Sequence, residues 1–146
     1  LYPINLIMAR KDQLETFKEV LKSEGLKFTP QRSLVFDECM KDKGHRECDQ
    51  IHTALSRHNI SKATVYRTID ILVKYDILRK MDIGDGRFRY ERKLDRKHHD
   101  HMICIESGDI IEFVSDEIEE LQDQIAMKHG YKIVKHVHQL FVKPVK

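Results

Sequence analysis

The chain has 146 residues, of which 40% are hydrophobic and 34% are charged, and its formal net charge is +2. This length fits one domain or two small ones with real hydrophobic cores, and the charged fraction predicts a soluble surface. Three cysteines with no pair at short spacing fit the reducing environment of a cytoplasmic protein. No apolar run is long enough to cross a membrane, and the three separated cysteines, Cys39, Cys48 and Cys104, argue against a disulfide framework and a four-thiolate zinc site.

The first third of the chain predicts three helices behind a short N-terminal extension, residues 1–8. Apolar residues at helical spacing mark the first helix, which stops near Gly25: Leu14, Phe17, Val20 and Leu21. Thr29 as N-cap and Pro30 at the first helical position open the second. The third covers about residues 49–58, and three of its residues form a buried face: Ile51, Ala54 and Leu55.

A fourth helix, capped by Ser61, is predicted over residues 62–73. One face is apolar and the opposite face carries Arg67, with Tyr66 at its border. Arginine can bond guanine edges or phosphates, and an aromatic ring can contact a thymine methyl, so this helix is suited to a major groove. Taken alone, it is better explained as an ordinary amphipathic surface helix.

A basic hairpin follows this helix. Residues 77–83 have strand character, residues 84–86 form a Gly-Asp-Gly turn signal, and residues 87–90 alternate basic with aromatic side chains. Helices followed by such a hairpin are typical of a winged helix-turn-helix domain, here residues 9–91. The wing would place Arg87 and Arg89 beside the phosphate backbone.

Residues 92–97 are highly charged and are predicted to be an interdomain hinge. Residues 98–101, His-His-Asp-His, then begin a strand that runs to Ile105. Successive side chains of a strand point to opposite faces, so His99 and His101 share one face, whereas His98 and Asp100 share the other. One strand could therefore contribute to two metal sites, with imidazole and carboxylate ligands that suit zinc, iron, manganese or cobalt.

The rest of the chain predicts a second strand at residues 110–113, a helix capped by Ser115, and a final strand over residues 131–142. The fold class is therefore α+β, with the winged domain followed by a small β-β-α-β domain, residues 98–146. Such a domain is too small to be stable alone and has open strand edges. We expect it to form a homodimer, which would place two recognition helices on DNA, and two such dimers could associate into a tetramer.

Several runs, in this order, give the chain its resemblance to the ferric uptake regulator family of bacterial metalloregulators. They lie at residues 25–32 (GLKFTPQR), 63–68 (ATVYRT), 84–86 (GDG), 98–104 (HHDHMIC), 110–113 (IIEF) and 128–131 (KHGY). The second and fourth runs are the most specific. The resemblance spans about residues 14–142.

The resemblance implies two sets of metal ligands. The regulatory site would consist of His45, Glu91, His99, His101 and Glu112. A second site in the C-terminal domain would consist of His98, Asp100, Glu119 and His136. Many members also hold a structural zinc with two Cys-x-x-Cys pairs, which this sequence lacks, so we expect no thiolate structural zinc.

The resemblance also extends the candidate DNA-binding residues. With those proposed above they are Lys27, Arg32, Lys62, Thr64, Tyr66, Arg67, Arg87 and Arg89. The implied partner is double-stranded operator DNA, and the implied function is metal-dependent regulation of transcription. The two glutamates of the regulatory site, where peroxide sensors favour aspartate, indicate an Fe(II)-responsive repressor of iron-uptake genes.

Three other interpretations stay open. A manganese- or zinc-responsive regulator would use nearly the same ligands. A metal-dependent hydrolase could use a His/Asp/Glu site, but such a site needs an open coordination position and a nearby general base, and the sequence offers no motif for them. A DNA-binding protein that has lost its response to metal is the third.

Overall fold

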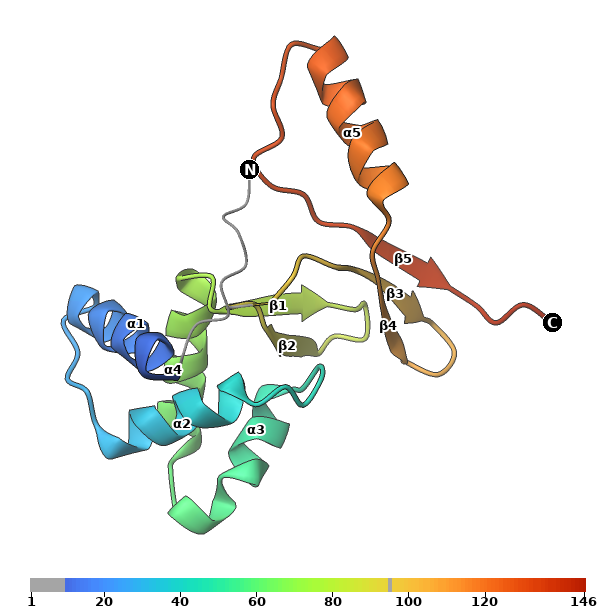
Figure 1. The fold of residues 1–146 in the computed structure, drawn as a ribbon. Coiled ribbons are helices and arrows are strands. Elements are labelled where there is room, and N and C mark those ends of the chain that lie inside the picture. Colours follow the sequence, from blue (N-terminus) through green and yellow to red (C-terminus); the bar gives the residue numbers. More distant parts are fainter. Residues whose placement is uncertain (1–9, 95) are drawn as a thin grey trace. The chain divides into compact units, whose positions relative to one another are not determined.

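The computed structural model describes residues 10–94 and 96–146. The predicted extension at residues 1–8 and Asp95 of the predicted hinge lie outside the described residues. Two compact units follow one another in the chain, one ending at Lys97 and the other beginning at His98 (Figure 1). We call them the winged unit and the C-terminal unit. None of the described helices is long and apolar enough to cross a membrane.

Local signals set the helices of the winged unit. Helix α1 spans Arg10–Ser23, and the chain turns away from the helix at Gly25, whose φ of 69° is favourable for glycine. Helix α2 spans Pro30–Met40, and the Thr29 hydroxyl accepts the Arg32 backbone N–H at 3.2 Å. Helix α4 spans Lys62–Lys74, and the Ser61 hydroxyl accepts the Thr64 N–H at 3.1 Å. These three predictions are confirmed.

The third predicted helix is wrong in its length. Helix α3 covers only Cys48–Ala54, and a separate 3₁₀ turn, η1, covers Ser56–His58. Leu55 between them leaves helical geometry, with φ −101° and ψ 10°. Ile51 and Leu55 are buried as predicted, but Ala54 is exposed because the helix ends at that residue.

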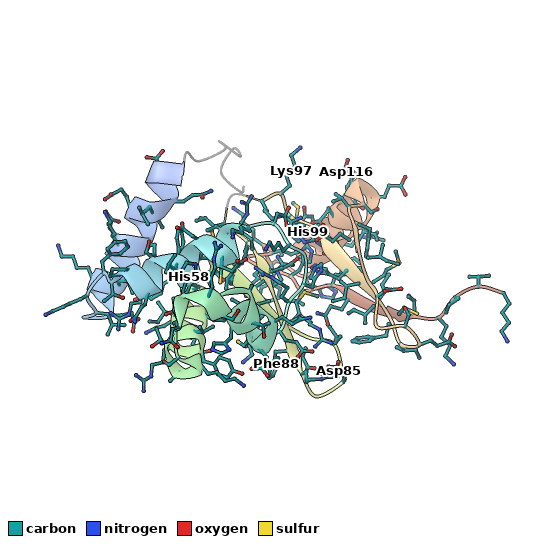
Figure 2. All side chains as sticks on the ribbon, turned by 90° about the horizontal axis from the view of Figure 1, so that it is seen from below. His58, Asp85, Phe88, Lys97, His99 and Asp116 are labelled. Atoms are coloured by element: carbon teal, nitrogen blue, oxygen red, sulfur yellow. The ribbon has the colours of Figure 1, made fainter. Side chains whose placement is uncertain are left out.

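The wing follows α4 as predicted. Strand β1, Leu78–Asp82, pairs antiparallel with strand β2, Phe88–Arg92. Figure 2 shows Asp85 at the turn of the wing and Phe88 on its returning strand. The core of the winged unit joins α1, α2, α3, α4 and the base of the wing, and its fully buried members include Phe17, Val35, Phe36, Val65, Ile69 and Leu72.

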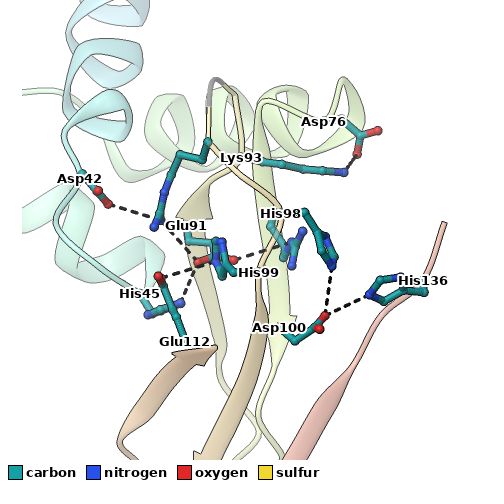
Figure 3. A network of polar contacts seen from close by, with 12 residues as sticks. Asp42, His45, Asp76, Glu91, Lys93, His98, His99, Asp100, Glu112 and His136 are labelled. Atoms are coloured by element: carbon teal, nitrogen blue, oxygen red, sulfur yellow. Dashed lines mark hydrogen bonds and ion pairs between the residues drawn. The ribbon is translucent and has the colours of Figure 1, made fainter. Parts of the chain in front are cut away.

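The predicted hinge begins later than residue 92, because Arg92 is the last residue of β2. The backbone N–H groups of Lys93 and Leu94 both donate to Ile77 O, at 2.9 and 3.1 Å. The Lys93 ammonium pairs with Asp76 at 3.3 Å (Figure 3), and the Arg96 guanidinium pairs with Asp42 at 3.4 Å. Lys93, Leu94 and Arg96 of the predicted hinge are thus bound to the winged unit by hydrogen bonds and ion pairs.

The C-terminal unit has the predicted β-β-α-β order. Strands β3, Asp100–Cys104, and β4, Ile110–Phe113, are antiparallel, and strand β5, Gln139–Val142, lies parallel to β3 on its other edge. Helix α5, Asp116–Lys128, is capped by Ser115 and connects β4 to β5. No residue of α5 is buried.

Two strand boundaries in this unit were predicted wrongly. Strand β3 begins at Asp100 rather than at His98. The last strand covers only residues 139–142 rather than 131–142, because ladder pairing with β3 begins at the His101–Gln139 pair. His136 and His138 therefore precede the strand, and they make different contacts, His136 with Asp100 and His138 with the ring of Phe113.

Candidate metal centres and nucleic-acid interface

One group of four metal-capable side chains lies wholly within the C-terminal unit. Its members are His98, Asp100, Glu119 and His136, and each offers a ligand atom within 4.8 Å of the others. His98 Nε2 lies 3.3 Å from Asp100 Oδ1, and His136 Nε2 lies 3.0 Å from the same oxygen (Figure 3). Glu119 Oε1 lies 3.1 Å from His98 Nε2 and 3.5 Å from His136 Nε2. We call this group the C-terminal cluster.

Different elements bring these side chains together. Asp100 opens β3, Glu119 lies in the first turn of α5, and His136 lies on the segment that leads into β5. The Gln122 amide nitrogen, one turn beyond Glu119, lies 3.0 Å from Glu119 Oε2 and 2.9 Å from His136 Nδ1. It thus orients two potential ligands, as residues behind metal ligands commonly do. The sequence analysis missed Gln122, whose i+3 spacing from Glu119 was the available signal.

The C-terminal cluster fits a divalent cation. It offers two imidazoles and two carboxylates, a set suited to zinc, iron or manganese. Asp100 is 2% exposed, and its Oδ2 has no hydrogen-bond partner among the described residues. A buried carboxylate oxygen in that state is costly, and a bound cation would satisfy it.

The opposite face of β3 carries a second set of donors. The His99 and His101 rings meet edge to face, with centroids 4.8 Å apart, and His99 Nε2 lies 3.5 Å from Glu112 Oε1. Glu112 lies on β4 directly opposite His101. The four residues thus fall into two separate donor sets, although His98 and His99 precede the strand rather than lying on its faces as predicted.

The winged unit contains a donor pair of its own. His45 Nε2 lies 2.7 Å from Glu91 Oε2, and the two side chains are 10% and 1% exposed. Glu91 lies on β2, near the guanidinium groups of Arg79 at 3.7 Å and Arg96 at 3.9 Å. An imidazole and a carboxylate so placed are chemically suited to the same ions as the C-terminal cluster.

Arg46 fixes the loop that carries His45. Its backbone makes a two-hydrogen-bond bridge to Tyr90, at 3.0 and 2.7 Å. Its guanidinium donates to the Glu38 carboxylate at 3.1 Å and to the Glu38 carbonyl at 2.9 Å. Burial would raise the pKa of Glu38, but hydrogen bonds from Lys41 and Arg46 outweigh it and hold that pKa below its usual value. The loop is thereby anchored to α2 and β2 together.

The candidate DNA-binding residues of α4 lie on its outer side. Val65, Thr68, Ile69 and Leu72 are buried, whereas Lys62, Tyr66 and Arg67 are exposed and Thr64 is half-buried. On the wing, Arg87 is 68% exposed but Arg89 only 16%. Before α2, Lys27 is exposed and its carbonyl accepts a hydrogen bond from the Arg32 guanidinium.

The cysteines belong to none of these donor groups. Cys39 is buried in the core of the winged unit, and burial raises the pKa of its thiol to about 12. Burial also raises the pKa of the half-buried Cys48. Both thiols therefore stay protonated at neutral pH in the protein without metal.

Comparison with known proteins gives consistent matches. The sequence model of the ferric uptake regulator family matches residues 23–141. A ferric uptake regulation protein from Rhizobium leguminosarum bv. viciae is 34% identical over 137 residues, which cover 92% of this chain and 96% of that protein.

Solved structures agree with the sequence matches. The Helicobacter pylori ferric uptake regulator, described as having three functional metal-binding sites, matches with a TM-score of 0.84 and 30% identity. That match covers 94% of this chain and 93% of the other. A zinc-bound manganese uptake regulator matches with a TM-score of 0.63 and 34% identity, covering 89% of this chain and 99% of the other.

These matches cover both units and rest on sequence and fold together. They exclude the hydrolase interpretation, because the matched family consists of regulators. The chain belongs to the ferric uptake regulator family, and it is accordingly a metal-responsive transcription regulator and not an enzyme.

Proposed function

We propose that the protein is an Fe(II)-responsive repressor of iron-uptake genes that acts in the cytoplasm as a homodimer on double-stranded operator DNA. The observation that carries this proposal is the placement of His45 and Glu91, 2.7 Å apart, at the base of the wing. The unit that presents the basic outer side of α4 thus also holds an imidazole and a carboxylate suited to iron.

We propose that one regulatory ion takes its ligands from both units. They are His45, Glu91, His99, His101 and Glu112, as the resemblance implies. A bound divalent ion supplies a cross-link, which would hold the winged unit at the angle that adjacent half-sites require. Such a link is a coupling free energy, typically about 1–3 kcal/mol, and it requires that DNA tighten metal binding by the same factor.

We assign a second ion to the C-terminal cluster. All four of its ligands come from one unit, so this ion would stabilise that unit rather than join two units. Its contribution to the stability of the unit matters more here because the sequence has no Cys-x-x-Cys pair to hold a structural zinc. The ordering of Glu119 and His136 by Gln122 supports this assignment.

A second copy of the chain is the proposed partner of α5. Leu121 and Ile125, one turn apart, are 58% and 51% exposed, and Ile118 continues the same stripe. An apolar stripe of this kind normally packs against another element. Figure 1 shows α5 standing clear of the three-stranded sheet of its own unit, and self-association would cover the stripe.

Zinc and manganese are the alternatives to Fe(II) as the native metal. Bare affinity for nitrogen and oxygen ligands favours zinc over Fe(II) and Mn(II), so the metal present in the cell would decide. Manganese is the second candidate, because the matched manganese uptake regulator is as similar in sequence as the iron regulators are. Metal analysis of protein purified without chelator or added metal would distinguish these possibilities.

DNA binding with and without metal tests the proposal. A duplex is first selected from a random pool by the protein loaded with Mn(II), a stable substitute for Fe(II), and its affinity is then measured under anaerobic conditions with Fe(II), Mn(II), Zn(II) or chelator. We expect binding to weaken at least tenfold in chelator, as a coupling of about 1.4 kcal/mol requires. Equal affinity in metal and in chelator would rule out metal-dependent repression.

Two variants separate the two activities. His99→Ala should abolish the metal-dependent gain in DNA affinity. Arg67→Ala should abolish DNA binding but leave the number of bound ions unchanged. Equal loss of both activities in either variant would contradict this division of roles.

A further inference from the structure

Two carboxylates at the start of α3 contact both of the elements proposed to read DNA. Glu47 precedes the helix and Asp49 is in its first turn. Glu47 Oε1 lies 3.5 Å from Arg87 Nη1 and 3.3 Å from Arg89 Nη1, so it pairs with both of the wing arginines proposed to bind DNA. Arg89 has a further partner in Asp85, at 2.8 Å.

Asp49 makes the equivalent contacts to α4. Its Oδ1 accepts the hydroxyl hydrogen of Tyr66 and lies 3.6 Å from the Lys62 ammonium. The Tyr66 hydrogen bond lowers the pKa of Asp49, and Asp49 in turn raises the pKa of Tyr66 to about 12. Near pH 7 the pair is therefore a carboxylate and a neutral phenol.

The contacts of Lys62 with Asp49 and of Arg87 with Glu47 remain open to solvent on the side of the cation, whereas Arg89 is only 16% exposed. A hollow of about 290 Å³ lies between α3, α4 and the wing, and its walls include Glu47, Asp49, Tyr66 and Arg87. The side chains of Lys62 and Asp49 are 63% and 59% exposed. Incoming phosphates and bases can therefore reach Lys62 and Arg87, two of the cations that the carboxylates hold.

We propose that Glu47 and Asp49 are positioning residues that set how strongly the protein discriminates its operator from other DNA. The proposal rests on the DNA-binding role proposed above. It assigns these residues no contact with a base. They act through the arginines of the wing and through Lys62 and Tyr66.

Two physical effects act in the same direction. Long cationic side chains have many rotamers, and a carboxylate that restricts them preserves the geometry needed for base contacts. The carboxylates also oppose the attraction of the cations for any phosphate, which supplies nearly all of the affinity for non-specific DNA. Both effects raise the ratio of specific to non-specific affinity.

The test uses full-length protein loaded with Mn(II) and two probes, the duplex selected above and a random-sequence duplex of equal length. The Glu47→Gln/Asp49→Asn double variant should tighten binding to the random duplex and should not tighten binding to the selected one. We expect the ratio of the two dissociation constants to fall about tenfold, of the order of one mismatched base pair. On the random duplex, the slope of log affinity against log salt should steepen by about one for each additional phosphate contact.

Matched variants make the result specific. Glu24 accepts hydrogen bonds from Lys74 and the Tyr75 hydroxyl, both at 2.7 Å, which repeats the lysine–tyrosine pattern of Asp49. Glu24→Gln removes one carboxylate charge, half of what the double variant removes, and should leave the ratio within twofold of wild type. Asp49→Glu, with Glu47 retained, keeps the carboxylate and should preserve the salt slope. Thermal unfolding and metal content verify that each variant is folded and loaded.

The outcomes are distinguishable. An unchanged ratio and salt slope in the double variant would overturn the proposal. So would equal weakening on both duplexes, because that would make the carboxylates simple supports of the fold. If wild-type protein fails to prefer the selected duplex, the DNA-binding proposal itself fails, whatever the variants do.

Discussion

Asp100 shows how much can depend on one buried carboxylate. It is 2% exposed, and its Oδ1 lies within 3.3 Å of the Nε2 atoms of His98 and His136. Aspartate is rarely buried to this degree without cationic or metal partners. The buried Asp100 carboxylate should therefore lower the stability of the fold when no metal is bound. It should raise that stability when a metal is bound.

Asp100→Asn should remove one bound ion per chain. A ligand present at a hundred times its dissociation constant stabilises a protein by about 2.7 kcal/mol, so the variant should lose roughly that much metal-dependent stabilisation. Urea unfolding with and without Zn(II) measures this difference. Glu120→Gln, which neutralises an exposed carboxylate outside the cluster, is the control. Unchanged metal stoichiometry in Asp100→Asn would mean that the cluster is not a metal site.

Ser61 gives a prediction for the recognition helix. Its hydroxyl accepts the Thr64 N–H at the start of α4, and losing such a cap costs about 1 kcal/mol. Ser61→Ala should therefore lower the free energy of unfolding by about that amount, as measured by urea denaturation. Ser61→Asp keeps an acceptor and should restore stability. If the alanine and aspartate variants were equally destabilised, the cap would not be the cause.

The loop between α2 and α3 depends on one anchor, Glu38. This residue is 4% exposed and pairs with Lys41 at 3.1 Å, Lys43 at 3.5 Å and Arg46 at 3.1 Å. Glu38→Gln leaves these cations without their shared carboxylate. We expect a loss of about 2 kcal/mol in the free energy of unfolding, within the usual range for a charged hydrogen-bond partner.

This contribution should depend on pH in one direction. The pKa of Glu38 is lowered from 4.5 by its partners, although burial opposes the shift. A lowered pKa means that the carboxylate stabilises the fold above pH 4.5 and that this stability is lost as the pH falls through the folded-state value. The stability difference between wild type and Glu38→Gln should be constant from pH 7 to about 5.5 and shrink below 4.5. A difference that grew in acid would refute the assignment, and Glu15→Gln, in an exposed pair with Lys18, serves as control.

Assembly is expected to depend on the stripe along α5. Leu121→Glu and Ile125→Glu place charge on it without disturbing a buried residue, because both side chains are more than half exposed. Each should weaken self-association by tenfold or more, as 1–3 kcal/mol of lost burial implies, and sedimentation velocity measures it. Met127, 75% exposed, is off the stripe, so Met127→Glu should leave the dimer intact. A wild-type monomer at micromolar concentration would contradict the proposed partner, and a tetramer would extend it.

Most of the secondary structure followed from signals that act within four residues. Thr29, Ser61 and Ser115 cap the helices that they were predicted to cap. The alternation of side chains along residues 98–101 was likewise enough to predict two separate donor sets. The membership of His45, Glu119 and His136 came from the family resemblance, because no local pattern connects residues so far apart.

Three features were decided by the tertiary structure. Residues 131–138 include the apolar residues Tyr131, Ile133, Val134 and Val137, but a strand needs a partner, and among the described strands β3 pairs only with residues 139–142 on that edge. Gln122 gained its role because the segment that carries His136 lies beside α5. Glu47 carried no signal in the sequence, and its contact with the wing arises only when segments about 40 residues apart pack together. The sequence by itself determined the secondary structure and the ligand chemistry of most segments, through helix caps, periodicity and side-chain type. Tertiary packing decided which segments come into contact, because ion pairs and strand ladders depend on distances that no local signal specifies.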